Sequence, residues 1–564
     1  MKADLTRNSF DPLKHFSGVL MQQGRVQLDA DWNEQSSILL HLIRQLVVDF
    51  GGSAVSPKGG FRIDPLTTAT VVDNDVLIAP GSYYVDGILC ELESTPMPIL
   101  SWDAKDGHNI KVANWTVDGG GYQVGQYVEV YDDSAKPVAA AVLCKVAKLD
   151  YSNLTLTLDT DVSSLRNAAN GRLRRLTTYL TQPDLPNPAP LSSGKPRYQL
   201  YLDVWERAIT YVEDDSIREV ALNGPDTAAR SRVVWQVKAL PATLEGCVAQ
   251  GSLADQLQPW NRGLLRARAE PAQVSTDPCT ISPDSLYRGP ENQLYRVEIH
   301  TGSNDPSGLP PSFKWSRENG AVVFPIVKLS SGDTATTVTL GNLGRDDRFS
   351  LEPGDYVEVQ DDNSVLSGSA GKLLQVQAVD SNNCIVTLAG NVAAGVGNDP
   401  TLHPLLRRWD HKAGDAAQGG LTLGKDGAAL ISTASSSAGK FVIQIANPWL
   451  DLEDGVQIQF EELSYASYRS GDYWLIPARV ATGDVIWPQE SYTDANGKTS
   501  SNPVAKGPDG ITHHYAPLAV VTVKAGAAPQ VTQCGVARAV ANPVGVIDTP
   551  VLVNNPGNLA VNKP

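Results

Sequence analysis

The sequence lacks long apolar runs and basic runs. No stretch of about 18 apolar residues occurs, and the first residues, MKADLTRNSFDPLKHF, contain no apolar segment of the kind that a secretory signal needs. The 46 Lys and Arg face 62 Asp and Glu, a net charge of −16, and no basic stripe is interleaved with aromatic residues. We therefore expect synthesis in the cytoplasm without a signal peptide, no membrane insertion and no nucleic-acid partner.

Cysteine is scarce and scattered. The six cysteines include no CxxC motif, which argues against a zinc knuckle or a redox motif. Cys384 falls in an expected strand and should point into its core. Cys247 and Cys279 are 32 residues apart around an irregular segment, and whether they pair is left open.

Catalytic and metal-binding residues do not occur at familiar spacings. His513-His514 is the one adjacent histidine pair, but neighbours in a strand point to opposite faces. Leu366 and Leu373 stand where a phosphate loop needs its first glycine and its Ser or Thr. Adjacent carboxylates do not by themselves form an acid/base pair, and three such pairs also lack the calcium-loop pattern: Asp132-Asp133, Asp361-Asp362 and Glu461-Glu462. We predict no catalytic residues, no metal, no cofactor and no enzymatic activity.

Turn-forming residues are abundant. Gly and Pro number 48 and 37 of 564 residues, against only 3 Met, so many turns and few long helices are expected. A pattern of one glycine, alternating apolar and polar residues and two acids begins at Gly125 (GQYVEVYDD), Gly354 (GDYVEVQDD) and, more weakly, Gly455 (GVQIQFEEL). Each copy predicts a half-buried strand that leaves a tight turn.

The first two copies continue alike along the chain. A second expected strand, 142–149, corresponds to 373–379, and a third, 154–158, corresponds to 384–388. We predict two copies of one small β-meander, about 229 residues apart. The third copy is equally well explained as an ordinary antiparallel strand start.

One helix is expected near the N-terminus. Asp31 can cap it while Glu34 reaches back to the Asp31 amide, and Gly51-Gly52 can end it. Its apolar residues fall on one stripe, through which we expect the helix to pack, either within its own chain or, if it is exposed in the free subunit, on a partner: Trp32, Leu39, Leu42, Ile43, Leu46 and Phe50.

The fold class that follows is mainly β and multidomain, with antiparallel sandwich or barrel modules, an N-terminal helix and the repeated meanders. The proline-rich stretch 181–197, TQPDLPNPAPLSSGKPR, predicts a linker and a domain boundary. The expected divisions are an N-terminal helix and hairpin region (1–100), a first meander module (101–180), a central β domain (181–345), a second meander module (346–440), a C-terminal β region (441–538) and an extended tail (539–564).

Trp and Arg gather in three short strings, WER, KWSREN and RRWDH, each with an acid nearby. Such cation–π and salt-bridge clusters either lock one domain together or face a neighbouring subunit, and both interpretations stay open. The tail from Val540 to Pro564 is apolar but broken by prolines, so we expect it to extend across a neighbour or fold back on its own chain. The candidate interface residues are Trp32, Trp205, Arg207, Trp315, Arg317, Arg408, Trp409, Val551, Leu552 and Val553.

Several longer strings together resemble a bacterial family of unassigned function that is often encoded beside phage-tail-like contractile injection systems. The strings are HFSGVLMQQGRVQLDADWNEQ (15–35), YLDVWER (201–207), REVALNGPDTAAR (218–230), YRGPENQLYRVEIH (287–300), FKWSRENG (313–320), LLRRWDH (405–411), GDYWLIPAR (471–479) and GITHHYAPLAVV (510–521). The likeness spans about 2–523. It implies no catalytic residues.

The resemblance implies a structural subunit, baseplate or peripheral, of a phage-tail-like particle that can be released from the cell. Its expected partners are other particle subunits and copies of itself, bound through β surfaces and terminal arms. The alternative is a carbohydrate- or receptor-binding adhesin of such a particle, because exposed aromatic residues on β modules can stack on a cell-surface glycan. A third interpretation, a cell-wall hydrolase, lacks any identifiable set of catalytic residues.

Overall fold

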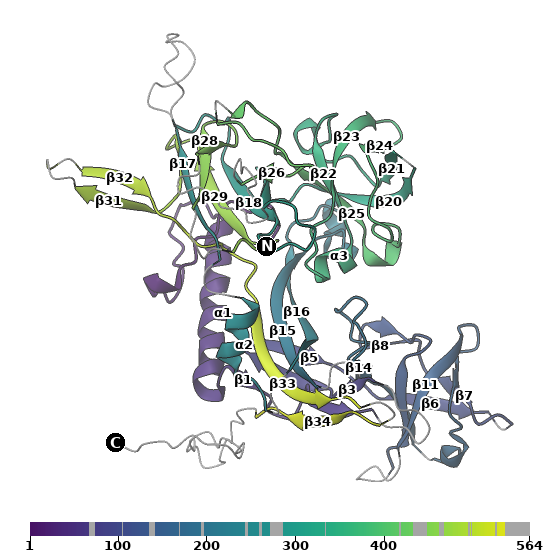
Figure 1. The fold of residues 1–564 in the computed structure, drawn as a ribbon. Helices are drawn as coiled ribbons and strands as arrows, with labels where there is room; N and C mark the ends of the chain where they lie inside the picture. The colour runs from purple at the N-terminus through teal and green to yellow at the C-terminus, as the bar shows by residue number, and fades with distance from the viewer. Residues whose placement is uncertain are drawn as a thin grey trace, which may run out of the picture. The chain divides into compact units, whose positions relative to one another are not determined.

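The computed structural model of the chain describes residues 1–66, 74–103, 105–134, 141–168, 170–192, 197–242, 246–258, 262–270, 286–332, 334–416, 419–431, 448–461, 467–493, 497, 499–524 and 527–535. The chain divides into two compact units, and we describe each by itself. Unit 1 comprises Met1–Leu40, Glu206–Arg232 and Gln258–Thr512, and unit 2 comprises His41–Trp205, Val233–Leu257 and His513–Pro564. None of the helices in the described part is both long and apolar enough to cross a membrane. The expected mainly β, antiparallel architecture is confirmed (Figure 1).

Unit 2 contains small antiparallel sheets, one short helix and a closed barrel. The sheets are β1-β4-β5 (Ala54–Val55, Gly81–Val85, Ile88–Leu92), β14-β3-β2 (Thr177–Thr178, Val76–Ile78, Ile63–Pro65), β8-β9 (Thr116–Val117, Gly120–Gly121) and β16-β15-β33-β34 (Arg230–Pro241, Arg197–Ile209, His514–Thr522, Gln530–Gln533). The helices are α2 (Gln250–Leu257), the 3-10 turn η2 (Ser163–Leu165) and the second half of α1 (Asp29–Gly51), whose first half belongs to unit 1. β15 and β16 run on into unit 1. The expected linker does not separate two bodies here, because Gln182 and Leu191 are buried within unit 2.

Unit 1 is built around a sheet whose strands come from distant parts of the sequence. Its sheets are β26-β19-β18-β29-β30 (Ala429–Leu430, Ser312–Ser316, Gln293–Thr301, Tyr473–Arg479, Asp484–Val485), β17-β28-β27 (Leu264–Ala269, Val456–Glu461, Leu450–Asp451) and β31-β32 (Gln489–Thr493, Thr499–Pro503). Its short helices are α3 (Asp362–Leu366), η1 (Pro12–Lys14), η3 (Asp215–Ile217), η4 (Val220–Leu222), η5 (Asp347–Phe349) and η6 (Pro400–Leu402). Every residue of β18 and β19 is buried. The N-terminus lies against this sheet, where the Met1 amine donates to Tyr473 Oη at 2.8 Å (Figure 1).

Each unit contains one closed six-stranded barrel, and the two barrels share one topology. Barrel 1 consists of β6 (Met97–Trp102), β7 (Asn109–Val112), β10 (Tyr127–Asp132), β11 (Ala141–Asp150), β12 (Thr155–Leu158) and β13 (Gly171–Arg175). Barrel 2 consists of β20 (Val323–Ser331), β21 (Ala335–Leu340), β22 (Tyr356–Gln360), β23 (Leu373–Asp380), β24 (Ile385–Ala389) and β25 (Leu405–Trp409). The strand order β10-β11-β12-β7-β6-β13 corresponds position by position to β22-β23-β24-β21-β20-β25. The two predicted meanders are therefore confirmed, as parts of larger equivalent barrels.

The correspondence extends to local chemistry. Asn153 Nδ2 donates to Asp150 Oδ2 at 2.8 Å, and in the equivalent turn Asn383 Nδ2 donates to Asp380 Oδ2 at 2.7 Å. The residue that follows each asparagine has a positive φ, and in barrel 2 this residue is Cys384 (φ 52°), which is half-buried against the barrel core. This Asp–Asn pairing is a side-chain turn motif that tolerates the left-handed conformation. The same turn thus sets the same register in both barrels.

The third copy of the glycine motif does not belong to a barrel. Gly455 does open a turn with positive φ, as do Gly125 and Gly354. The strand that follows it, β28, lies in the three-stranded sheet with β17 and β27. The interpretation as an ordinary strand start therefore holds for this copy.

Helix α1 (Asp29–Gly51) differs from the expected helix in its start and in its packing. It begins two residues before Asp31, so the predicted cap and its return contact from Glu34 are wrong. Asp29 instead accepts from the Thr6 amide at 2.9 Å, and Glu34 accepts from Ser9 Oγ at 2.6 Å. The polar residues of the preceding segment supply these partners, and Asp31 remains in the first turn, where the helix dipole favours an acid.

A disulfide joins Cys247 to Cys534 within unit 2, so Cys247 pairs with a residue 287 positions away rather than with Cys279. Cys279 lies outside the described residues. The two Cα atoms are 5.6 Å apart, a usual separation for a disulfide. The bond fixes the segment before α2 to the end of β34.

Replacing both Cys247 and Cys534 by Ser should lower the free energy of unfolding by roughly 2–4 kcal/mol under oxidising conditions, because the crosslink restricts a very long loop in the unfolded chain. Denaturant unfolding with and without dithiothreitol measures this difference. In dithiothreitol the wild type should match the variant. A wild type that keeps its full advantage when reduced would contradict the prediction.

Candidate interaction surfaces and charged sites

Most of the expected Trp–Arg interface residues are buried within their own unit. Trp315, in β19, is 2% exposed, and Trp409, in β25, is 1% exposed. In unit 2, Trp205 is buried with its ring centroid 4.8 Å from that of His513. In unit 1, the mostly buried Arg207 donates to Asp362 at 2.7 Å. These placements favour the interpretation that the clusters lock each unit together.

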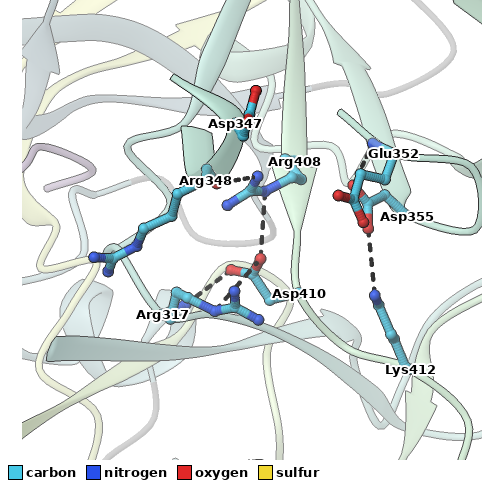
Figure 2. A pocket seen from close by; sticks show the side chains of 8 residues that line it. All are labelled: Arg317, Asp347, Arg348, Glu352, Asp355, Arg408, Asp410 and Lys412. Carbon is cyan, nitrogen blue, oxygen red and sulfur yellow. Dashed lines mark hydrogen bonds and ion pairs between the residues drawn. The ribbon is translucent and has the colours of Figure 1, made fainter. Parts of the chain in front are cut away.

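Arg317 and Arg408 line an open pocket of about 130 Å³ in unit 1. Figure 2 shows both side chains directed toward Asp410 and Lys412 directed toward Asp355. Arg408 Nε lies 3.3 Å from Asp410 Oδ1, and its Nη1 donates to backbone carbonyls of η5 and the residue after it. The pocket is lined by four cations and four acids: Arg317, Arg348, Arg408, Lys412, Asp347, Glu352, Asp355 and Asp410. Its four cations and four acids thus compensate one another in charge.

A buried ion network connects barrel 2 to the central sheet of unit 1. Lys314 Nζ, in β19, lies 2.6 Å from Glu358 Oε2 of β22 and 3.5 Å from Glu298 Oε1 of β18. Arg296 Nε donates to Glu298 at 2.7 Å, and Lys2 Nζ donates to it at 3.0 Å. These five side chains are at most 23% exposed, and Glu358 is fully buried.

The charges of this network hold its carboxylates ionised. Burial raises the pKa of Glu358, but Lys314 and Lys2 outweigh burial and lower this pKa to about 2. Burial also raises the pKa of Glu298. Lys2, Arg296 and Lys314 outweigh it and hold this pKa well below its usual value. The sequence interpretation missed this network. The signal was available in YRVEIH and FKWS, where charged residues alternate within strands that carry large apolar residues.

The adjacent histidines face different carboxylates, as neighbours in an extended segment should. His513 Nδ1 lies 2.6 Å from Asp203 Oδ1, and His514 Nδ1 lies 2.8 Å from Asp86 Oδ2. Asp203 also accepts from Lys238 Nζ at 2.7 Å. Within the described ranges no group of three or more His, Cys, Asp or Glu side chains is arranged to hold a metal ion.

His411 is a separate, fully buried histidine in unit 1. Its Nε2 lies 2.9 Å from the Gly427 carbonyl oxygen, and its ring stacks on Tyr356 with centroids 4.9 Å apart. Burial lowers the pKa of His411 to about 4. The ring is therefore neutral at neutral pH and donates from Nε2.

Acidification from pH 6.5 to pH 4 should destabilise the wild type more than His411→Phe. The unfolded histidine takes up a proton near pH 6.5 and the folded one only near pH 4, so the stability from the neutral ring is complete above pH 6.5 and is lost as pH falls through this window. The neutral ring of His411 contributes roughly 1–3 kcal/mol to the free energy of unfolding above this window. Urea unfolding of both proteins at pH 7, 5.5 and 4.5 measures it. If the stability of the wild type and of His411→Phe fell equally as pH is lowered, His411 would not be held neutral by burial.

A broad exposed apolar surface in the described part of the chain is on α1. Ala30 and Ile38 are the buried residues of the helix. Seven large apolar side chains, between 47% and 68% exposed, form what we call the α1 face: Trp32, Leu39, Leu40, Leu42, Ile43, Leu46 and Phe50. The predicted stripe therefore exists, and its side chains face outward rather than packing within the described part of the chain.

The segment before α1 adds to this apolar surface. It has no regular secondary structure from Phe16 to Leu28, and Gln35 Oε1 of the helix accepts from the Val19 amide at 2.7 Å. Its exposed apolar residues are Leu13, Phe16, Leu20, Met21, Val26 and Leu28. The sequence interpretation missed their exposure; the signal was a group of apolar residues without the period of a strand or helix. The other expected interface residues, Val551, Leu552 and Val553, lie outside the described residues.

Comparison with known proteins identifies the family of the chain. No curated protein matches it. Residues 1–99, 189–263 and 247–544 match a family described as a family of unknown function, DUF6519. The matched ranges include barrel 2 and omit most of barrel 1, so the likeness is less continuous than the strings from 2 to 523 implied. The chain belongs to this family of unknown function, DUF6519.

Proposed function

We propose that the chain is a structural subunit, baseplate or peripheral, of a phage-tail-like contractile injection particle. It binds neighbouring subunits through the α1 face, β surfaces and its terminal arms. The observation that carries the proposal is the α1 face, because seven large apolar side chains on one helix are costly to leave in water and mark an interaction site. The string GRVQLDADWNEQ, which leads into this helix, is also part of the resemblance to proteins encoded beside such particles.

Incorporation into particles tests the proposal. The host's own gene is replaced by versions encoding Ile43→Glu or Gln45→Glu, and purified particles are probed for the subunit. Both variants add one Glu to an exposed position of α1, but only Ile43 lies on the α1 face. We expect Ile43→Glu to be missing from particles and Gln45→Glu to be present. A host that makes no tail-like particle, or normal incorporation of Ile43→Glu, would refute the proposal.

Deletion of Val540–Pro564 tests the expected arm. An apolar, proline-broken segment cannot build its own core, so removing it should leave the melting temperature of the body nearly unchanged. The truncated subunit should nevertheless fail to enter particles, because we propose that the arm binds a neighbour. Normal occupancy of the truncated subunit would show that the arm folds on its own chain or is dispensable.

A glycan-binding role in the same particle is the second candidate, and barrel 1 favours it. Trp115 and Tyr151 pair on this barrel with ring centroids 4.9 Å apart, and Tyr151 is 66% exposed. Trp115 is half-buried against the barrel core and supports Tyr151, whose exposed ring can stack on a sugar ring. Glycan-array binding that is abolished by Tyr151→Ala would support this role. We also propose that the chain is not an enzyme; turnover of peptidoglycan that one carboxylate substitution abolishes would disprove this.

A further inference from the structure

The exposed residues of α1 follow the spacing of a helix–helix seam. Trp32, Ser36, Leu39, Ile43, Leu46 and Phe50 are separated by four, three, four, three and four residues. All six are exposed. A sustained three-four spacing places side chains along one line that packs knobs into holes of another helix. The spacing therefore indicates that the occupant of the α1 face is a helix rather than a strand or an extended, proline-rich arm.

The residues beside this seam indicate more than one partner helix. Leu40 and Leu42 flank it on opposite sides, and both are about half exposed. Val47 extends the first flank and is half-buried. A two-stranded coil covers only the central line of such a stripe, whereas a bundle also covers apolar flanks. The width of the α1 face thus fits a bundle of three or more helices.

The charges of the face permit an identical partner. Charged residues beside a seam normally select the partner helix and its direction. Among the seam and flanking positions of α1, only Asp49 is charged. Apart from Asp49 near its C-terminal end, nothing on the face repels a second copy, and no charge pattern selects a different helix. In a parallel arrangement each seam residue meets its own equivalent, so Trp32 lies beside Trp32 and Phe50 beside Phe50.

The available area is sufficient for association. The exposed parts of the seven apolar side chains come to an area on the order of 700 Å² per chain, and the segment before the helix adds further apolar surface. A standard stable interface buries about 800 Å² per partner. The α1 face together with the segment before it thus offers about the area of a standard interface.

We infer that the α1 face binds further copies of this chain, and that three or more α1 helices, related by rotation about one axis and therefore parallel, form a bundle. This deepens the proposed function, on which it rests in treating the α1 face as an intersubunit surface. Self-association of the purified chain is measured without any particle, so a failure of this inference can be told from a failure of the proposed function.

Sedimentation of the full chain over a range of concentrations tests the inference, with Ile43→Glu and Gln45→Glu as matched variants. We expect the wild type and Gln45→Glu to form the same oligomer of three or more chains. Ile43→Glu should associate roughly 100-fold more weakly or worse, because each copy would bury an unpaired carboxylate. Its melting temperature, measured where all three proteins are monomeric, should stay unchanged, because Ile43 is 57% exposed in the single chain.

A crosslink tests the parallel direction. Ser36 lies on the seam nearer the N-terminal end of α1, so Ser36→Cys places equivalent thiols side by side only in a parallel bundle. We expect mild oxidation to link Ser36→Cys chains through this position, with Gln45→Cys as the control that does not link. Absence of the crosslink in an oligomer that Ile43→Glu abolishes would overturn the parallel arrangement.

Two results would overturn the inference as a whole. A wild type that stays monomeric at all concentrations, while Ile43→Glu still fails to enter particles, would assign the face to a different protein and leave the proposed function intact. An oligomer that survives Ile43→Glu but is lost on deletion of Val540–Pro564 would assign self-association to the tail.

Discussion

Lys314→Met should lower the free energy of unfolding by roughly 3–5 kcal/mol, because it leaves two buried carboxylates without their shared cation. Lys314 is 2% exposed and lies between Glu358 and Glu298, whose side chains are 0% and 5% exposed. Methionine fills a similar volume, so the loss reports mainly charge rather than a cavity. Urea unfolding at pH 7 measures it.

Lys412→Met is the matched control. Lys412 also forms an ion pair, with Asp355 at 3.5 Å, but its side chain is 63% exposed. Exposed pairs contribute about 0–1 kcal/mol. The double variant Lys314→Met with Glu358→Gln should recover part of the loss, because it removes the buried charge that loses its ion pair with Lys314, whereas Glu298 keeps Arg296 and Lys2. Equal effects of Lys314→Met and Lys412→Met would show that the network does not stabilise unit 1 as described.

Gly455→Ala should lower the free energy of unfolding by roughly 3–5 kcal/mol, far more than Gly354→Ala, the same change in another copy of the glycine motif. Gly455 has φ +86°, a conformation that costs an alanine about 1–2 kcal/mol. A Cβ there would also lie 2.3 Å from the Leu286 carbonyl oxygen and 2.9 Å from that of Glu270. Both are backbone atoms, so relief requires the chain to shift, as in an overpacked core.

Gly354→Ala is the comparison, because its φ is +101° and a Cβ there would meet no atom within 4 Å. Only the conformational cost of about 1–2 kcal/mol applies. Thermal unfolding of the two variants measures the difference. A loss at Gly354 as large as that at Gly455 would mean that the turn conformation, and not the close approach of the backbone, determines the cost.

The repeat was predictable from sequence because its signals are local. The glycine turn and the alternation that follows it lie within nine residues, and both recur in the two barrels. A further signal went unused: RLRR at 172–175 and LLRR at 405–408 form the equivalent closing strands β13 and β25. The third copy could not be separated from the others in this way, because a strand's neighbours in the sheet are set by distant segments.

Three other features depend on distant parts of the chain and were beyond the sequence interpretation. Periodicity identified the apolar stripe of α1, but a stripe does not say whether the same chain covers it. The Cys247–Cys534 bond joins residues that no spacing rule connects. Lys2 enters the core of unit 1 because Glu298, nearly 300 residues later, provides its partner.

Ser94 and Arg175 mark where the chain of unit 2 enters and leaves barrel 1. Ser94, just before its first strand, donates to the carbonyl oxygen of Arg175, the last residue of its closing strand, at 2.7 Å. Its core is a separate group of side chains from that of the neighbouring sheets. The chain therefore leaves and rejoins its path at adjacent points, and a few residues would be enough to close the gap if the barrel were absent. This position is therefore an insertion site. Evolution or an engineer can exchange one compact domain for another there without changing the direction of the strands on either side.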